Sequence, residues 1–237
     1  MSVRHPATDA RTNLPMTSPT PLRALVTLGP THESVDAVRF IGNRSSGRMG
    51  TEIARALQQA GCDVQVLAGP CQPAGMDSLN KIVRFRCAAE LKALLEVHWP
   101  SHDLLIMAAA VADWKPANQV QGKMRRQSAT LSLSLEPVPE ILGSLTTRPN
   151  QFIVGFALEP SDELLSSARD KLQRKRADCV VANPLETMDA DLIAATLLWP
   201  EGRVERPGDG SPWSKQACAG WLCERFVPAA IAKRCGG

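Results

Sequence analysis

The sequence predicts an α/β, Rossmann-like fold: a doubly wound, mostly parallel sheet with an inserted strand segment and an antiparallel edge hairpin. Three observations predict it. Wholly apolar segments such as 103–110 (DLLIMAAA) are typical of central parallel strands, which are covered on both faces. Segments with helical spacing alternate with these strands, as in βαβ units. The polar turn at 43–50 (NRSSGRMG), which contains two glycines, leads from the first strand region into a helix.

The elements follow in order along the chain. The first strand is predicted at 23–27 (RALVT), and the first helix ends at Gly61, a common terminator. Further buried strands are predicted at 63–68, 82–87, 103–110, 152–157 and 178–182. Helices are predicted at 49–60, 88–98, 162–175 and 215–233. Pro228 lies inside the last helix and should kink it.

Two segments depart from this alternation. Residues 113–127 show no period and carry four basic side chains, and 130–135 (TLSLSL) alternates strictly, which predicts a half-exposed strand. Together they form an insert on one fold. Residues 192–199 and 203–205, joined at 200–202 (PEG), predict the antiparallel hairpin at the sheet edge.

Composition narrows the class of protein. Residues 1–20 are rich in Pro, Thr and Ser and lack the apolar stretch of a signal peptide, so we expect a disordered tail followed by a single domain at 21–237. The net charge of +3 is small and Tyr is absent, which makes nucleic-acid binding an unfavoured interpretation. Seven cysteines form no CxxC pair, which indicates a reducing compartment. No apolar run reaches membrane length, and we expect a cytoplasmic protein.

The turn at 43–50 is the most informative segment. A glycine-containing turn that opens a helix places unpaired backbone N–H groups and the positive end of the helix dipole at one point, where a phosphate binds well. Ser45 and Ser46 add hydroxyl donors, and Gly47 and Gly50 allow close approach of the backbone. The pattern is neither GxGxxG nor a Walker loop, and an ordinary capped α/β turn is an equally open interpretation.

Several segments should meet at one sheet edge, because ligands of open α/β sheets bind beyond the carboxyl ends of the strands. The segments 29–31, 43–50, 108–113 and 156–159 all follow or end buried strands. Lys171 and Lys175, four residues apart on one helix face, would add cations opposite the turn. Such a cluster suits a polyphosphate, although the two lysines are also explained as solvated surface residues.

Several motifs of the sequence resemble those of a known family. The segment 27–50 (TLGPTHESVDAVRFIGNRSSGRMG) is similar to the first motif of bacterial phosphopantothenoylcysteine synthetase, TxGPTxExxDxVRxIxNxSSGxMG. Residues 108–114 (AAAVADW) resemble its AAVADY/W motif, and 123–126 (KMRR) stands where the family has KxKK. Residues 154–159 (VGFALE) resemble VGFAxE, and Lys171, Lys175 and 181–183 (VAN) resemble KxxxK followed by AN. The decarboxylase often fused ahead of this ligase has no counterpart in the tail.

The resemblance implies a ligase of coenzyme A biosynthesis. The carboxylate of 4′-phosphopantothenate would attack the α-phosphate of CTP, which gives an acyl-cytidylate and pyrophosphate, and L-cysteine would then displace CMP. By position, the resemblance assigns Asn43 and Lys123 to catalysis. It assigns to the nucleotide the residues Met107, Ala108, Ala109, Asp113, Lys123, Pro139, Glu140, Ile141, Leu142, Phe156, Lys171 and Lys175. Gly29, Ser45, Ser46 and Gly47 join this set from the phosphate turn and its neighbour.

The resemblance also implies a divalent metal, Mg²⁺ or Mn²⁺, with unknown ligands, and a homodimer in which the insert reaches the partner subunit. There are departures from the family. KMRR replaces KxKK, Glu140 replaces an Asp, Pro160 follows Glu159, and Asn183-Pro184 replaces AND. ATP in place of CTP stays open. The alternative from another class is a divergent, non-catalytic module that binds a nucleotide or dinucleotide.

Overall fold

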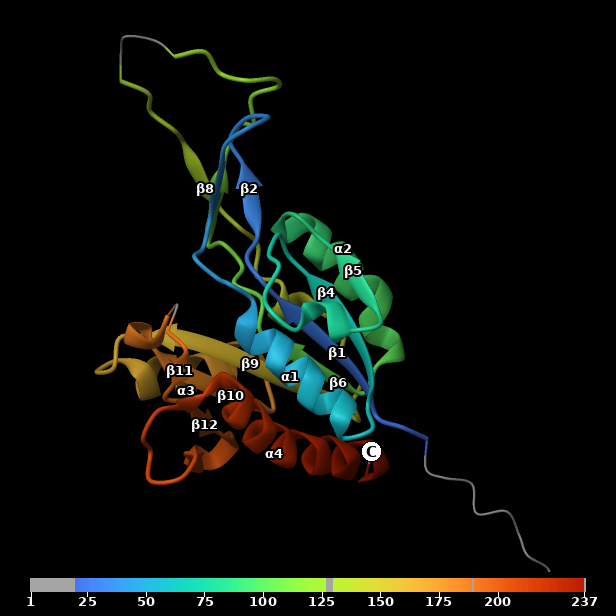
Figure 1. Ribbon diagram of the computed structural model, residues 1–237. Coiled ribbons are helices and arrows are strands. Elements are labelled where there is room, and N and C mark those ends of the chain that lie inside the picture. Colours follow the sequence, from blue (N-terminus) through green and yellow to red (C-terminus); the bar gives the residue numbers. More distant parts are fainter. Residues whose placement is uncertain (1–19, 127–129, 189, 237) are drawn as a thin grey trace, which may run out of the picture.

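The computed structural model describes residues 20–126, 130–188 and 190–236. The predicted tail therefore lies, except for Thr20, outside the described residues. The core is an eight-stranded sheet (Figure 1). In spatial order its strands are β13 (Val204–Glu205), β12 (Thr196–Leu198), β10 (Cys179–Pro184), β9 (Phe152–Glu159), β6 (Leu104–Met107), β1 (Arg23–Leu28), β4 (Asp63–Ala68) and β5 (Ile82–Arg84).

The six strands from β10 to β5 are parallel, and β12 and β13 extend the β10 edge in antiparallel pairing. From β1 the chain proceeds through β4 to β5 on one side and then returns to β6, β9 and β10 on the other. The order of strands thus reverses between β1 and β6, which is where a sheet of this kind opens a crevice for a ligand. The predicted doubly wound parallel sheet is confirmed.

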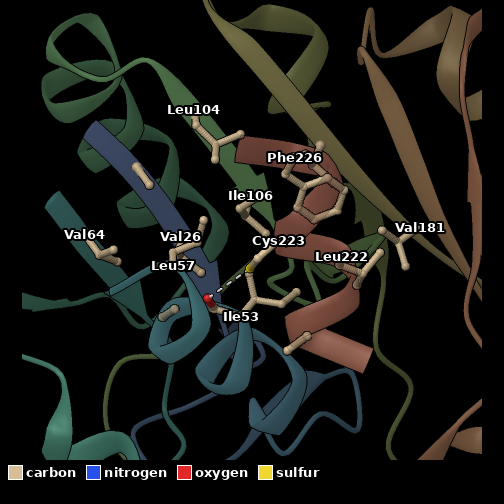
Figure 2. Packing of buried hydrophobic residues seen from close by; sticks show 14 of the residues in the cluster. Val26, Ile53, Leu57, Val64, Leu104, Ile106, Val181, Leu222, Cys223 and Phe226 are labelled. Atoms are coloured by element: carbon tan, nitrogen blue, oxygen red, sulfur yellow. Dashed lines mark hydrogen bonds between the residues drawn. The ribbon is translucent and has the colours of Figure 1, made fainter. Parts of the chain in front are cut away.

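The four helices cover the sheet in pairs. They are α1 (Arg48–Gln59), α2 (Ala88–His98), α3 (Leu164–Arg174) and α4 (Lys215–Gly236). One apolar cluster joins α1 and α4 to one face of the sheet, and a second joins α2 and α3 to the other face. Figure 2 shows the first cluster, where the Cys223 Sγ–H of α4 donates to the Ile53 carbonyl of α1 at 3.8 Å. Each fully buried side chain, such as Phe226, contributes roughly 1.5–3 kcal/mol.

Two further strand pairs form an arm that projects from the sheet (Figure 1). We define the arm as residues 32–42, 114–126 and 130–137. It contains β2 (His32–Ser34) paired with β3 (Phe40–Gly42), and β7 (Trp114–Pro116) paired with β8 (Leu135–Pro137). At its base, the Glu33 carboxylate accepts the first N–H of α2, from Ala88, at 2.9 Å. The arm is therefore anchored to the sheet domain through a helix cap.

The remaining elements are short. The strands β11 (Leu192–Ile193) and β14 (Trp213–Ser214) pair with each other near the start of α4. Single 3-10 turns are η1 (Met76–Ser78), η2 (Trp99–Ser101), η3 (Leu142–Ser144), η4 (Leu185–Thr187) and η5 (Pro200–Gly202). No helix in the described part of the chain has both the length and the apolar character needed to cross a bilayer.

Several sequence expectations need correction. The alternating segment 130–135 is not a strand except at Leu135, where β8 begins, and the hairpin of β2 and β3 was not expected. The strand expected at 82–87 ends at Arg84, and the one expected at 103–110 spans only Leu104–Met107. The edge hairpin is confirmed for β12 and β13, but Leu192–Ile193 leaves it to pair with β14, which contains Trp213.

Candidate active site

A cavity of about 810 Å³ opens at the carboxyl ends of β1, β6, β9 and β10, beside the reversal in strand order. Most residues that the resemblance and the phosphate turn assigned to catalysis or to the nucleotide line it. They are Asn43, Ser45, Ser46, Gly47, Met107, Ala108, Ala109, Asp113, Pro139, Glu140, Ile141, Leu142, Phe156, Lys171 and Lys175. The sheet topology brings these segments together, because parallel strands all end at the same edge.

The turn before α1 presents a helix N-terminus to this cavity. Gly47 precedes the helix with φ of +73°, a left-handed conformation that glycine adopts at little cost. In the described structure no side chain caps this end and its first turn carries no acidic residue. Its early N–H groups are therefore available to an anion. Gly50 lets the helix lie against β1, since a Cβ there would stand 2.5 Å from the Leu28 Cβ.

A second wall is the loop after β6, which hydroxyl groups tie to the end of β1. The Thr27 Oγ1 accepts the Ala109 N–H at 3.1 Å, and the Thr31 Oγ1 accepts the Ala112 N–H at 3.0 Å. From the other side, the Asn43 Nδ2 donates to the Val111 carbonyl at 2.9 Å. Asn43 thus lies between the turn and this loop, with its carboxamide orientation set by a backbone contact.

The third wall is cationic. Lys171 and Lys175 on and just after α3 line the cavity, each opposite a carboxylate: Lys171 Nζ is 3.8 Å from Glu159 Oε1, and Lys175 Nζ is 3.1 Å from Glu140 Oε2. Burial lowers the pKa of Lys171, and the nearby charge of Lys175 lowers it further, while Glu159 and Asp113 oppose the change. These lysines are half-buried and not fully solvated, which favours the ligand interpretation of them.

Two predicted residues lie outside the cavity. Gly29 is buried next to the loop after β6 and is not part of the cavity lining. The Gly29 carbonyl accepts the Ala110 N–H at 2.9 Å, and Cys71 Sγ occupies the space beside Gly29. Lys123 is exposed on the arm, where the neighbouring Gly122 and Met124 contact the loop between β2 and β3. The structure therefore does not bring Lys123 together with the other predicted residues within one chain.

The candidate set from sequence missed several polar residues that line the cavity, among them Arg48, Arg174 and Asn183. Arg48 is the first residue of α1 and pairs with Asp191 at 2.6 Å. Arg174 shares α3 with Lys171, so helical spacing could have found it. The Oδ1 of Asn183 is buried and has no hydrogen-bond partner in the described structure. An unpaired buried acceptor is costly, which marks Asn183 as a position that a ligand would satisfy.

The cavity offers single carboxylates to a metal ion but, among the described residues, no preassembled cluster of ligands. The described residues contain no group of three or more His, Cys, Asp or Glu side chains arranged to hold a metal ion. Its lining does include the carboxylates of Asp113, Glu140 and Glu159. Oxygen donors of this kind suit Mg²⁺, which keeps several waters and binds through one or two carboxylates together with substrate phosphates.

The chain is similar to a described protein family and to curated proteins. Residues 20–227 match the model of the family described as the DNA/pantothenate metabolism flavoprotein C-terminal domain. The chain is 35% identical over 196 residues to the coenzyme A biosynthesis bifunctional protein CoaBC of Vibrio cholerae serotype O1, covering 78% of this chain and 48% of that protein. It is 39% identical over 168 residues to a cysteine/cysteine sulfinic acid decarboxylase from an unknown prokaryotic organism, covering 69% and 46%.

The chain thus spans about half the length of these curated relatives. The fit to a solved structure is more complete. The crystal structure of the C-terminal domain of the coenzyme A biosynthesis bifunctional protein CoaBC superposes with a TM-score of 0.72 and 27% identity. The match covers 89% of this chain and 96% of that chain. The Rossmann-like architecture is therefore shared along nearly the whole of that domain.

Proposed function

We propose that this chain, which belongs to the family of DNA/pantothenate metabolism flavoprotein C-terminal domains, is a phosphopantothenate–cysteine ligase of coenzyme A biosynthesis. The observation that carries the proposal is the cavity, in which an uncapped helix N-terminus faces two half-buried lysines. Similarity to nearly all of the CoaBC C-terminal domain supports it. The matches to the decarboxylase relative and to full-length CoaBC each cover less than half of the relative, so the proposal draws on the CoaBC C-terminal domain, of which 96% is covered.

The proposed reaction has two steps. A carboxylate oxygen of 4′-phosphopantothenate forms a bond to the α-phosphorus of CTP, the bond from that phosphorus to the bridging oxygen breaks, and pyrophosphate leaves with the electron pair. The product is an acyl-cytidylate. The amine of L-cysteine then attacks the acyl carbon, CMP leaves, and the amine loses a proton as the amide forms.

The first step requires stabilisation of negative charge. We assign the triphosphate to the N–H groups at the start of α1 and to Lys171 and Lys175 on the opposite wall. Charge-assisted contacts of this kind stabilise the charge that grows on the leaving pyrophosphate. A bound Mg²⁺ or Mn²⁺ would further neutralise the phosphates. The carboxylates in the cavity lining that could hold it are those of Asp113, Glu140 and Glu159.

The second step requires a neutral donor at the acyl oxygen. An amide nitrogen carries two N–H groups, and Asn43 gives one to the Val111 carbonyl. The other is free to point into the cavity that Asn43 lines. We assign Asn43 to the acyl group of the cytidylate, where it would stabilise the oxyanion that develops when cysteine attacks.

We further propose a cytoplasmic homodimer. The arm carries Lys123 and exposes apolar side chains, among them Phe40, Trp114 and Leu133. A two-fold arrangement of arms would cover these side chains and would account for Lys123 as a residue that acts in the cavity of the second copy. The seven free thiols are in line with a reducing compartment.

The alternative is a non-catalytic module that holds a nucleotide or dinucleotide. The departures Asn183-Pro184 and KMRR motivate it. Pro184 is the last residue of β10, directly after Asn183, which lines the cavity. Isothermal titration with CTP, ATP and NADP separates the two functions by ligand. Release of pyrophosphate that depends on added phosphopantothenate, faster with CTP than with ATP, is the expected result. Binding of any of the three ligands without such release would overturn the ligase.

A further inference from the structure

We propose that Asp36 is the positioning residue that fixes Lys123. Asp36 lies in the loop between β2 and β3, and its side chain is fully buried in an arm that is otherwise largely exposed. A buried carboxylate needs partners for both of its oxygens. The partners that it has divide into two groups, one within its own loop and one on the basic segment that contains Lys123.

The first oxygen shapes the loop. Asp36 Oδ1 accepts the N–H of Val38 at 2.8 Å and the N–H of Arg39 at 2.7 Å. These are contacts two and three residues along the chain, typical of an Asx turn. They form a tight connection between β2 and β3 without involving any distant segment.

The second oxygen reaches the basic segment. Asp36 Oδ2 accepts the N–H of Met124 at 3.1 Å and pairs with the Arg39 guanidinium at 2.5 Å. That guanidinium in turn donates to the Met124 carbonyl at 3.4 Å. Both backbone groups of Met124 are therefore engaged by one ion pair.

Backbone contacts complete the attachment on the other side of Lys123. The Ala37 N–H donates to the Gly122 carbonyl at 3.0 Å, and the Val120 N–H donates to the Val35 carbonyl at 3.1 Å. Lys123 thus lies between two residues that the loop holds, Gly122 and Met124. Its own side chain is exposed and directed by this backbone, with Asp36 at the centre of the contacts.

The inference rests on the proposed function, because it gives Asp36 a role in nucleotide activation only through Lys123. The substitution Asp36→Asn tests it with little change in shape. An Asn keeps one oxygen for Val38 and Arg39, but it replaces Oδ2 with an NH₂ group that faces two donors, Met124 N–H and the guanidinium. The link to the basic segment is lost while the turn can remain. Asp209→Asn is the matched control, since Asp209 accepts the Ser211 N–H at 3.0 Å in the loop between β13 and β14, outside the arm.

The first measurement is hydrogen exchange, followed by mass spectrometry on a peptide that spans 118–126. Loss of a contact to a charged acceptor should speed exchange there by about tenfold or more in Asp36→Asn, and Asp209→Asn should match the wild type. Unchanged exchange in Asp36→Asn overturns the proposal. This result does not depend on any catalytic activity, so it stands even if the wild type releases no pyrophosphate and the proposed function fails.

The second measurement is a double-mutant cycle on pyrophosphate release in a single turnover. Lys123→Gln and Asp36→Asn should each slow release by about tenfold or more, and the double variant should be no slower than Lys123→Gln alone. Additive effects would show that Asp36 acts independently of Lys123 and would overturn the proposal. Light scattering on each variant shows whether the assembly state is the same, so that loss of partner contact is not mistaken for loss of position.

Discussion

Asn43 donates one amide hydrogen to the Val111 carbonyl and lines the cavity. Its second hydrogen is the one that the proposed function assigns to an acyl oxygen. In the proposed reaction, activation would rely mainly on cations, whereas amide formation would use this neutral donor. Asn43→Ala should therefore slow the cysteine step more than activation, by about 10²–10³-fold, the typical effect of losing one oxyanion donor. Acyl-cytidylate should accumulate. Single-turnover assays that follow pyrophosphate and amide separately measure the two steps.

Asn43→Asp is a useful companion variant, because it keeps the size but replaces the donor with a carboxylate. It should behave like Asn43→Ala in the cysteine step. Equal slowing of both steps in Asn43→Ala would make the residue a general positioning group. If neither step is slowed, Asn43 has no role in the reaction.

The proposed contact between Lys171 and the nucleotide predicts that nucleotide affinity depends on pH in a defined direction. Burial and Lys175 lower the pKa of Lys171, so its charge is lost at lower pH than that of a free lysine. A bound triphosphate favours the charged form and raises this pKa, so binding takes up protons as the pH approaches it. Affinity for CTP should fall as the pH rises through the lowered pKa of Lys171, that is, at lower pH than for a lysine with the free pKa of about 10.4. Calorimetry in buffers of different ionisation enthalpy measures both affinity and proton uptake.

Lys171→Arg provides the control for this pH effect, since a guanidinium stays charged throughout. The variant should bind CTP with a weaker pH dependence than the wild type, even if its geometry changes the affinity itself. An unchanged pH dependence would assign the proton uptake to another group.

The positions of single residues at the cavity were predictable from the order of strands and helices, and unpredictable where three-dimensional packing decides. Asp113 follows β6, Phe156 lies in β9, and Lys171 lies on the helix between β9 and β10; all three line the cavity. Gly29 follows a strand too, yet the loop after β6 covers it. Asn183 was left out of the candidate set because an unpaired acceptor becomes visible only once its surroundings are known.

At the scale of elements, the N-terminus of α1 depends on the space around Gly47. Its φ is +73°, and a Cβ there would stand 2.7 Å from Cys71 Sγ. Gly47→Ala should therefore destabilise the fold by roughly 1–2 kcal/mol for the left-handed backbone alone, with a steric term added. Differential scanning calorimetry should show Tm lower by several degrees, and calorimetric titration should show weaker CTP binding.

The Cys71→Ala background separates the two causes. Removing the sulfur opens the space beside residue 47, so the double variant should regain the steric part of the loss and keep the backbone part. If Gly47→Ala costs as much in the Cys71→Ala background as in the wild type, the contact with Cys71 contributes nothing.

Elements with regular periods and buried faces were predictable, and the arm was not. The spacing of apolar residues located α1 and α2, and continuous apolar runs located β1, β4, β9 and β10. The segment 130–135 alternates as a strand should, yet only Leu135 belongs to a strand, because a strand forms only where another edge offers a ladder of hydrogen bonds. The strands β2 and β3 have three residues each, too few to show a period.

The whole molecule separates a well-packed sheet domain from an arm that leaves apolar surface uncovered. The buried clusters lie on the two faces of the sheet. Many of the exposed large apolar side chains lie on the arm instead, and include Val38, Phe40, Trp114, Val120, Leu131, Leu133 and Leu135. Such a gathering of apolar side chains is typical of an interaction surface. The charge of the neighbouring basic segment would favour an arrangement in which these side chains meet while Lys123 remains in reach of a phosphate ligand.

The exposed apolar side chains on the arm predict a dimer. Light scattering at micromolar concentration should give twice the chain mass of 25.6 kDa. Leu133→Glu should convert the dimer into a monomer, because a carboxylate buried in an apolar interface without a partner is strongly unfavourable. The matched control is Val97→Glu, which changes an even more exposed side chain, 72% against 44%, on α2 outside the arm. It should leave the mass unchanged. A wild-type mass of one chain would contradict the dimer. If Leu133→Glu remains a dimer, the contact between the two copies does not involve this part of the arm.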